Sequence, residues 1–441
     1  GMSARDFSIN TLHSSLHIDA SAGITPARPF ETAPLSIDGR LQLGMADVAT
    51  AFPALAPMIR QLPQRTPLQA VISADGRMDS LAIDTARIWM QRVFDMAAAG
   101  RVVDMTDMNR ISGRIGFRGS LSNTGFIKQT LFDARMRRTV DLPPLSLRAD
   151  IAMTRGTISG TMRAVTGSGR IALDGTWTGR TTSYSAKLRA DSLPVKAFLP
   201  TMGIGAVTAR ADIKGHGLDP MSPRAALTAG IAIEQAEYLG HVYSDIALTA
   251  TLADGRARAL LSSDNPAADL DMAVDATLSP TEYTWEADGR IRNLDLRAPG
   301  MADTTMSGHF GLRSSGRMLP DDGIIDASVD IDSLFWSMSG TDLHTGPVKA
   351  LFASTDSSVS ATIDNAGLHA SFSSPQGLDS LMTHLAATGP MMTRQMADRR
   401  IDVEALQRTL PPMRLDMHAS GPSLLADFLK GSGMSVNDIA L

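Results

Sequence analysis

The first residues whose types could do chemistry are two histidines near the N-terminus. His13 and His17 lie four positions apart, and Asp19 follows two positions later. Imidazole nitrogens and carboxylate oxygens are ligands that zinc accepts. In an extended segment, however, residues four apart share one face without converging on a single ion. The pattern therefore indicates scattered surface histidines, and we predict no metal site here.

Two acidic sets could hold calcium, which takes oxygen ligands. The sets are Asp269, Asp271 and Asp275, and Asp326, Asp330 and Asp332. Both alternate with apolar residues, so their side chains occupy the opposite face of an extended segment. Neither set has the glycine-bearing loop of an EF-hand. A solvated outer face of a sheet accounts for both sets without an ion.

The common catalytic motifs are missing from the sequence. The chain has no cysteine, which excludes disulfides, thiolate metal ligands and cysteine nucleophiles. It has no Walker A or Gly-x-Ser-x-Gly sequence, and the glycine pair at 203–205 lacks the later glycine of a dinucleotide-binding loop. Nothing selects a catalytic pair from the 46 acidic residues, although one sequence leaves a paired-carboxylate hydrolase open. We therefore expect no enzyme, no catalytic residue and no cofactor.

Composition limits the classes of partner. The 441 residues are 43% hydrophobic and carry a net charge of −5. These values are typical of a folded globular chain, and the absence of a basic run argues against a nucleic-acid partner. No apolar run of about 18 or more residues predicts a transmembrane helix. No signal peptide opens the chain, and Gly1 before Met2 resembles the remnant of a cleaved tag. We expect an internal fragment of a longer protein, whose membrane anchor lies outside it.

Most of the chain alternates between apolar and polar residues with a period of two, which is typical of half-buried strands. In the segment 169–190, Ile171 and Leu173 lie on one parity, and Tyr184 and Leu188 continue it after a polar turn. This pattern predicts an antiparallel hairpin with one apolar face, and roughly twenty to twenty-five similar strands follow one another along the chain. The apolar positions that we expect to line one face are Leu147, Ile151, Met153, Ile171, Leu173, Trp177, Tyr184, Leu188, Ile231, Ile233, Ile246, Leu248, Leu252, Leu270, Met272, Val274, Leu278, Tyr283 and Trp285.

Helical spacing is limited to a few segments, which we expect mostly near the C-terminal end. They are 194–199, 376–410, 422–430 and 48–62, the last interrupted by Pro53 and Pro57. The segment 86–99 is ambiguous, and we predict a strand there. We divide the chain into an N-terminal β-rich segment with short helices (1–120), a repetitive antiparallel β-groove (121–375) and a region of short helices and terminal strands (376–441).

A sheet of this length must cover its apolar face. Alternation indicates an antiparallel sheet with one wet face, and open twisted sheets rarely exceed about ten strands without curling or splitting. The sheet can form sandwiches whose inner faces interdigitate, or it can curl into a groove that protein does not fill. Aromatic residues make up only 5% of the chain and methionines number 25, which favours a groove with room for irregular apolar ligands. The same residues also serve as ordinary core fillers. We expect a mainly β fold with one long, strongly twisted and curled antiparallel sheet.

Several segments resemble the TamB branch of the AsmA-like family, especially its long Bacteroidetes members. The segments that carry the resemblance are LPPLSLRADIAMTRGTISG (142–160), GSGRIALDGTW (167–177), DSLPVKAFLP (191–200), ADIKGHGLDP (211–220), YLGHVYSDIALTATLADGR (238–256) and SSDNPAADLDMAVDATL (262–278). The similarity is strongest over residues 100–300. It rests on recurring sequence patterns of turns and strands, and the family has no catalytic motif to match.

The resemblance implies a periplasmic protein that is anchored in the inner membrane by a helix of the full-length chain. It further implies a β-groove that shields and conducts phospholipid between the inner and outer membranes, with acyl chains as its ligands. A role in outer-membrane biogenesis with a BamA-type barrel protein as partner is implied as well. The residues themselves leave open an interaction scaffold for outer-membrane protein assembly, with a filled β core and no lipid path. A surface adhesin of tandem sandwiches is a third alternative, although no domain-length repeat supports it.

Overall fold

A computed structural model gives the fold of residues 2–23, 33–51, 60–77, 79–104, 110–132, 136–179, 181–295, 306–338, 341–397, 410–420 and 438–440. In these residues the chain is mainly β, and 25 strands belong to one long antiparallel sheet. The predicted class and the antiparallel arrangement are thereby confirmed. The chain forms two compact units, of which unit 1 comprises residues 1–216 and 229–242 and unit 2 comprises residues 217–228 and 243–441. The division at residues 120 and 375 stays a prediction.

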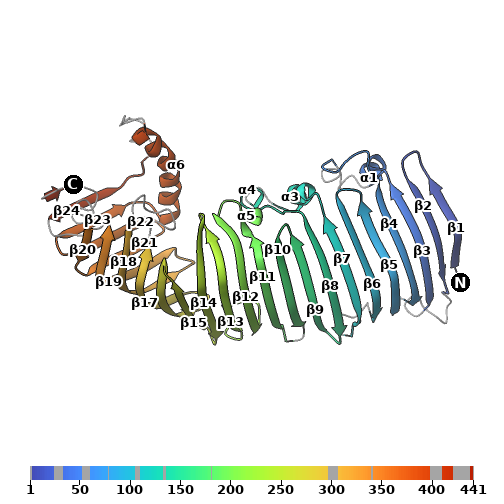
Figure 1. The fold of residues 1–441 in the computed structure, drawn as a ribbon, viewed down its shortest axis with the longest axis horizontal. Coiled ribbons are helices and arrows are strands. Elements are labelled where there is room, and N and C mark those ends of the chain that lie inside the picture. Colours follow the sequence, from blue (N-terminus) through green and yellow to red (C-terminus); the bar gives the residue numbers. More distant parts are fainter. Residues whose placement is uncertain are drawn as a thin grey trace. The chain divides into compact units, whose positions relative to one another are not determined.

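Unit 1 contains β1 to β12, and each of these strands pairs antiparallel with the next one in the chain (Figure 1). The strands are β1 (Met2–Asn10), β2 (Ser15–Ala22), β3 (Pro34–Leu43), β4 (Leu68–Arg77), β5 (Ser80–Met90), β6 (Phe94–Val103), β7 (Ser112–Leu121), β8 (Leu145–Thr154), β9 (Thr157–Thr166), β10 (Gly169–Thr178), β11 (Ser183–Pro194) and β12 (Ile204–His216). The next two strands, β13 (Ala226–Tyr238) and β14 (His241–Ala253), contain residues of both units; of β14 only His241 and Val242 belong to unit 1.

Unit 2 continues the same pattern, and its consecutive strands also pair antiparallel. One strand departs from this order, because β19 pairs with both β20 and β21 along its length. The strands are β14 (His241–Ala253), β15 (Arg256–Asn265), β16 (Ala268–Leu278), β17 (Tyr283–Asp295), β18 (Met306–Leu319), β19 (Ile324–Met338), β20 (Thr341–Thr345), β21 (Val348–Thr355), β22 (Ser358–Asn365), β23 (Leu368–Ser374), β24 (Arg414–Ser420) and β25 (Asp438–Ala440).

The hairpin predicted at 169–190 is present as β10 and β11. Leu173 pairs with Leu188, and Trp177 pairs with Tyr184. Directly paired residues of antiparallel strands point to the same face, so these four side chains share one face of the sheet. The predicted hairpin and its apolar face are therefore confirmed, and the structure adds the register of the two strands.

The described helices of unit 1 are short, whereas that of unit 2 has 20 residues. Those of unit 1 follow one edge, at the ends of the strands (Figure 1); they are α1 (Met45–Ala51), α3 (Gly125–Leu131), α4 (Met136–Thr139) and α5 (Val195–Phe198). Unit 2 contains α6 (Leu378–Ala397). At the edge of unit 1 a small buried cluster forms from Met45, Val48, Leu62, Met90 and Val93, against which Phe94 and Phe126 pack. The helices thus cover strand ends and leave most of the sheet uncovered.

Several local predictions can be compared with these elements. The helices expected at 194–199 and 376–410 are confirmed in part by α5 and α6, and the one at 48–62 begins as α1. Residues 52–59, 401–409 and 421–430 lie outside the described residues, and with them the helix at 422–430. The concentration of helices near the C-terminal end is not confirmed, because α1, α3, α4 and α5 all precede residue 200.

The segment 86–99, where we expected a strand, contains the turn of a hairpin between two strands. β5 ends at Met90 and β6 begins at Phe94, and Arg92 between them has φ of 63°. A non-glycine residue in this left-handed region is uncommon, so the turn carries no recognisable sequence signal. A single strand was therefore the wrong prediction for this segment, although both halves are extended.

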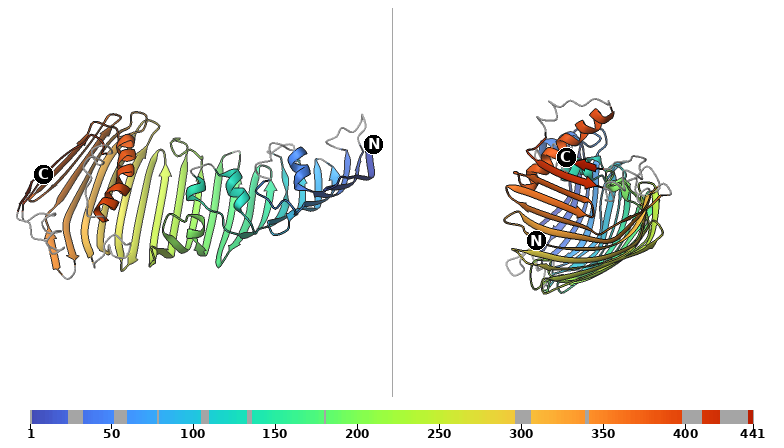
Figure 2. Two further views of the ribbon diagram at one scale, coloured as in Figure 1. Left: turned by 90° about the horizontal axis from the view of Figure 1, so that it is seen from above. Right: turned by 90° about the vertical axis from the view of Figure 1, so that its left-hand side faces the viewer.

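Each unit is a single layer of strands that stand side by side (Figure 2). The strands pack against their sheet neighbours, and no second sheet covers either face in the part of the chain that the structure describes. Two stacked sheets of a sandwich would instead interdigitate across about 10 Å. The apolar side chains of each unit therefore lie on one face of one layer. None of the helices in the described ranges is long and apolar enough to span a membrane.

Candidate apolar binding face

The predicted apolar positions of unit 1 share one face of its sheet. Strand pairing connects them in rows that run across the strands, so that Leu173 lies between Met162 and Leu188. The same face continues through β7 and β8, where Ile115 pairs with Ile151. All eight candidates of β8 to β11 belong to this apolar face: Leu147, Ile151, Met153, Ile171, Leu173, Trp177, Tyr184 and Leu188.

Unit 2 has a corresponding apolar face of its own. Leu248 pairs with Leu261, which pairs with Met272 in the next strand. All nine candidates of β14, β16 and β17 lie on this face: Ile246, Leu248, Leu252, Leu270, Met272, Val274, Leu278, Tyr283 and Trp285. The remaining two candidates, Ile231 and Ile233, share one parity of β13 and are half-buried.

Strand pairing adds residues to the apolar face of unit 2 that the sequence prediction did not include. Ala327 pairs with Phe352, and Phe352 pairs with Ala361, so the face extends through β19, β21 and β22. Leu261 and Ile291 belong to it as well. Each of these residues continues the apolar–polar alternation of its own strand. The same sequence pattern therefore identifies them.

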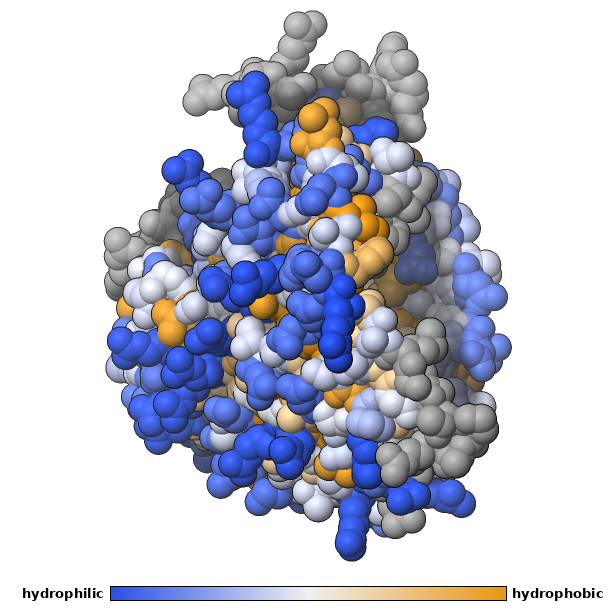
Figure 3. Space-filling model, turned by 90° about the vertical axis from the view of Figure 1, so that its right-hand side faces the viewer, coloured by the Kyte–Doolittle hydropathy of each residue, from blue (hydrophilic) through white to orange (hydrophobic). Residues whose placement is uncertain are grey.

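Within the described ranges, no second layer of the protein covers either apolar face. Among the candidates, Leu252 is buried, Trp177 and Leu188 are 38% and 40% exposed, and the others are half-buried. Fully packed cores bury such side chains almost completely. Seen from the side of β1, the space-filling surface shows apolar side chains exposed between hydrophilic ones (Figure 3). Each unit thus leaves an apolar face in contact with solvent, which is unusual for a folded chain.

The opposite face of each unit, here called the hydrophilic face, carries the charged residues. Its cross-strand neighbours form ion pairs such as Arg87–Asp95 at 2.6 Å, Arg317–Asp326 at 2.9 Å and Arg258–Asp275 at 3.8 Å. Hydrogen bonds from Arg87 hold the pKa of Asp95 below its ordinary value. Exposed pairs of this kind contribute about 0–1 kcal/mol each. The hydrophilic face is therefore solvated, as the alternation predicted.

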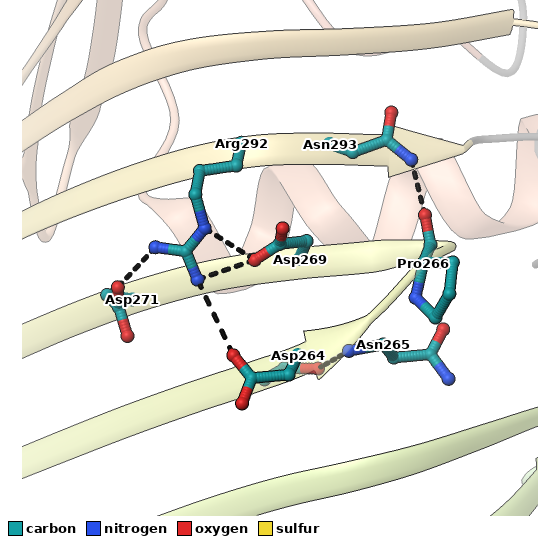
Figure 4. Close-up of polar contacts among 8 residues, drawn as sticks. Asp264, Asn265, Pro266, Asp269, Asp271, Arg292 and Asn293 are labelled. Atoms are coloured by element: carbon teal, nitrogen blue, oxygen red, sulfur yellow. Dashed lines mark hydrogen bonds and ion pairs between the residues drawn. The ribbon is translucent and has the colours of Figure 1, made fainter.

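Arg292 pairs with two of the three carboxylates of the first acidic set, Asp269 and Asp271. Its guanidinium contacts Asp269 at 2.5 Å, Asp271, and Asp264 at 3.9 Å (Figure 4). Hydrogen bonds to Asp269 and Asp271 raise the pKa of Arg292. The carboxylates thus have a cationic partner from the neighbouring strand. Among the described residues, no group of three histidine, aspartate or glutamate side chains could hold a metal ion.

The histidine pair near the N-terminus is separated by the start of a strand. His17 lies on β2, 3.3 Å from Asp19 and 3.7 Å from Asp6, whereas His13 precedes the strand. The two imidazoles therefore occupy different local structures, as a surface location implies.

Three open clefts lie over the strands, two in unit 2 and one in unit 1. The cleft of unit 1 has a volume of about 550 Å³ and is lined by side chains of the hydrophilic face, among them Asp150, Asp174 and Lys187, and by backbone at Gly160 and Gly175. The clefts of unit 2 have volumes of about 980 and 1080 Å³. Hydrophilic residues from consecutive strands line all three. The strand register places these hydrophilic side chains opposite the apolar faces, although residues of the apolar parity, such as Trp285 and Met272, also border the clefts of unit 2.

Comparison with known proteins returned no match: no protein-family model, no curated protein and no solved structure is significantly similar to this chain.

Proposed function

We propose that this chain is a non-enzymatic lipid-conducting protein whose apolar faces hold the acyl chains of phospholipids. One observation carries the proposal: each unit places a row-by-row continuous apolar face on a single-layered sheet, and protein does not cover that face. In this proposal each sheet curls toward its apolar side and forms a groove. The candidate residues of each unit line the groove of that unit.

The physical chemistry of the face suits an acyl chain. Burying one methylene group contributes about 0.8 kcal/mol, so a chain of about sixteen carbons gains roughly 6 kcal/mol when only half of its surface is covered. Such contacts need no polar partner and do not depend on the position of the chain along the face. The lipid can therefore slide from one strand to the next, with no chemical step.

The proposed cellular location and partner follow from the resemblance to TamB-like proteins. In the proposal the full-length protein is anchored in the inner membrane and lies in the periplasm, where it shields phospholipid between the inner and outer membranes. A BamA-type barrel protein of the outer membrane is the proposed partner. At about 4.8 Å between strands, the strands β1 to β12 of unit 1 alone extend over roughly 50 Å along their sheet.

The test compares two adjacent leucines of β15. Leu261 lies on the apolar face between Leu248 and Met272, whereas Leu260 is 44% exposed on the hydrophilic face. The purified protein is extracted, and its phospholipid is quantified by mass spectrometry. We expect co-purified phospholipid in the wild type and in Leu260→Glu, and a reduced amount in Leu261→Glu. Absence of phospholipid from the wild type, or equal amounts in both variants, contradicts the proposal.

The interaction scaffold with a filled core makes the opposite prediction for stability. In that case Leu261→Glu places a carboxylate inside a closed core, which costs several kcal/mol. On an open face the same carboxylate reaches water, and the variant folds. Circular dichroism of Leu261→Glu therefore separates the two functions, because only the scaffold predicts an unfolded variant.

A further inference from the structure

The larger cleft of unit 2 lies on the hydrophilic face and runs across six strands, from β14 to β19. Its volume is about 1080 Å³, and six strands spaced about 4.8 Å apart extend over roughly 24 Å. One row of directly paired residues forms one side of the cleft: Ala247, Ser262, Asp271, Arg290, Gly311 and Asp332. The cleft is therefore elongated, and it fits an extended ligand better than a compact one.

Most of the charges in the cleft are already paired. Arg292 binds Asp271, and Arg313 lies 3.5 Å from Asp288. Two charged groups remain: neither Arg290 nor Asp332 forms an ion pair with any residue of the described ranges. The cleft thus offers one free donor group and one free acceptor group.

Gly311 separates these two groups. It pairs with Arg290 on one side and with Asp332 on the other. A side chain at this position would collide with the Asp332 carboxylate, so the carboxylate lies over the glycine. The Asp332 carboxylate therefore covers the backbone of Gly311, next to the paired residue Arg290.

Aromatic rings adjoin the cleft at one end. His309, which lines the cleft, stacks on Phe335 with the ring centroids 4.6 Å apart and the planes at 17°. His344 contacts the same phenyl ring edge-on at 4.6 Å. His309 and His344 are exposed on either side of Phe335. His309 is thus the exposed ring that lines the cleft beside the charged groups, and Phe335 stacks on it.

We propose that this cleft binds an uncharged oligosaccharide. A sugar hydroxyl both donates and accepts hydrogen bonds, so neighbouring hydroxyls can accept from the Arg290 guanidinium and donate to the Asp332 carboxylate. The carbon-bound hydrogens of a sugar ring pack on the face of an aromatic ring, and the exposed His309 ring lines the cleft. The elongated cleft accommodates several sugar units in a row.

The charges of the cleft disfavour the alternative ligands. Arginines and aspartates line it in equal number: Arg290, Arg292 and Arg313, and Asp271, Asp288 and Asp332. A phosphate or carboxylate would meet the aspartates, and an ammonium group would meet the arginines, so neither gains from net opposite charge. A neutral ligand rich in hydroxyl groups avoids both penalties. This site lies on the face opposite to the proposed lipid path and does not depend on it.

The test titrates the protein with cellohexaose, maltohexaose and chitohexaose by isothermal calorimetry, with inorganic pyrophosphate as the charged probe. We expect at least one hexasaccharide to bind, and Arg290→Gln, Asp332→Asn and His309→Ala each to weaken that binding about three- to tenfold, as expected for the loss of one hydrogen bond or stacking contact. Arg256→Gln is the matched control, because Arg256 lies on the same face outside this cleft, and it is expected to leave the binding unchanged.

A second readout does not depend on the variants. In the wild type, the ring resonances of His309 are expected to shift during the hexasaccharide titration, whereas those of His369 on β23 are not. Binding that none of the three substitutions weakens, no binding of any hexasaccharide at millimolar concentration, or tighter binding of pyrophosphate would each overturn the proposal.

Discussion

Two adjacent residues of β10 give the sharpest test of the uncovered apolar face. Leu173 lies on that face between Met162 and Leu188. Ala172 lies on the hydrophilic face between Arg163 and Arg189. The substitutions Leu173→Glu and Ala172→Glu add the same side chain to neighbouring positions of one strand. Their effects differ only through the face that each side chain occupies.

The expected magnitudes follow from burial. Leu173 is half-buried, and Leu188 beside it is 40% exposed. Full burial of a leucine contributes about 2 kcal/mol, so replacing Leu173 on an open face costs about 1 kcal/mol of unfolding free energy. An unpaired carboxylate enclosed in a filled core would cost about 3–5 kcal/mol instead. Glutamate at position 172 gains two arginine neighbours, and we expect its effect on stability to lie within about 1 kcal/mol.

Two assays measure these effects. Urea unfolding, followed by tryptophan fluorescence, gives the change in stability. Displacement of a fluorescent fatty acid gives the affinity for an acyl chain. If Leu173→Glu removes contacts to about two methylene groups, the affinity falls roughly tenfold, because each methylene contributes about 0.8 kcal/mol. We expect Ala172→Glu to bind as the wild type does.

Either of two results would refute this reasoning. A Leu173→Glu protein that loses several kcal/mol or does not fold would mean that the face is closed in solution. Unchanged fatty-acid affinity in a folded Leu173→Glu protein would mean that the apolar face is not the binding surface.

Two further predictions concern local structure in unit 1. Gly100 has φ of 155°, and a side chain there would collide with the carbonyl oxygen of Arg114, so Gly100→Ala is expected to cost at least about 1–3 kcal/mol in urea unfolding. Gly175→Ala is the control, since the nearest atom to its added carbon lies at 3.4 Å, and equal costs for the two would contradict the steric argument. Arg87 lowers the pKa of Asp95, so this pair stabilises the fold above the unfolded pKa of Asp95, and the contribution is lost as the pH falls through the lower folded value. Arg87→Gln is expected to raise the Asp95 pKa toward its ordinary value in a carbon-detected NMR titration; an unchanged pKa would show that the ion pair does not form in solution.

The alternation of apolar and polar residues was enough to predict the strands and their faces. In β10 and β11, a polar turn between two alternating segments predicted the hairpin and placed Leu173 and Leu188 on its apolar face, and the structure shows that these two residues pair. Period-two patterns are local, and each strand of this sheet pairs with its neighbours in the sequence. Local information therefore sufficed for most of the sheet.

Features that depend on distant residues or on unusual backbone were not predictable in the same way. Arg92 turns the chain between β5 and β6 with a left-handed conformation that its side chain does not signal. The contact of Arg292 with Asp264 joins residues 28 positions apart and needs the register of three strands. The aromatic stack of His309 on Phe335 arises from a register shift between His309 and Gly311. An irregular pairing of this kind has no period in the sequence.

Because consecutive strands pair with each other, the sheet can gain or lose whole hairpins without rearranging the rest. Each hairpin within a unit contacts the strands directly before and after it and no second layer in the described ranges. The stability of such an array is approximately a sum of terms for each strand and its neighbours, as in repeat proteins. Gain or loss of one hairpin alters the length of a sheet by about 9.6 Å and keeps every other side chain on its original face, because two strands restore the direction of the chain. Insertion or deletion of hairpins can therefore adjust the reach of the protein in fixed steps.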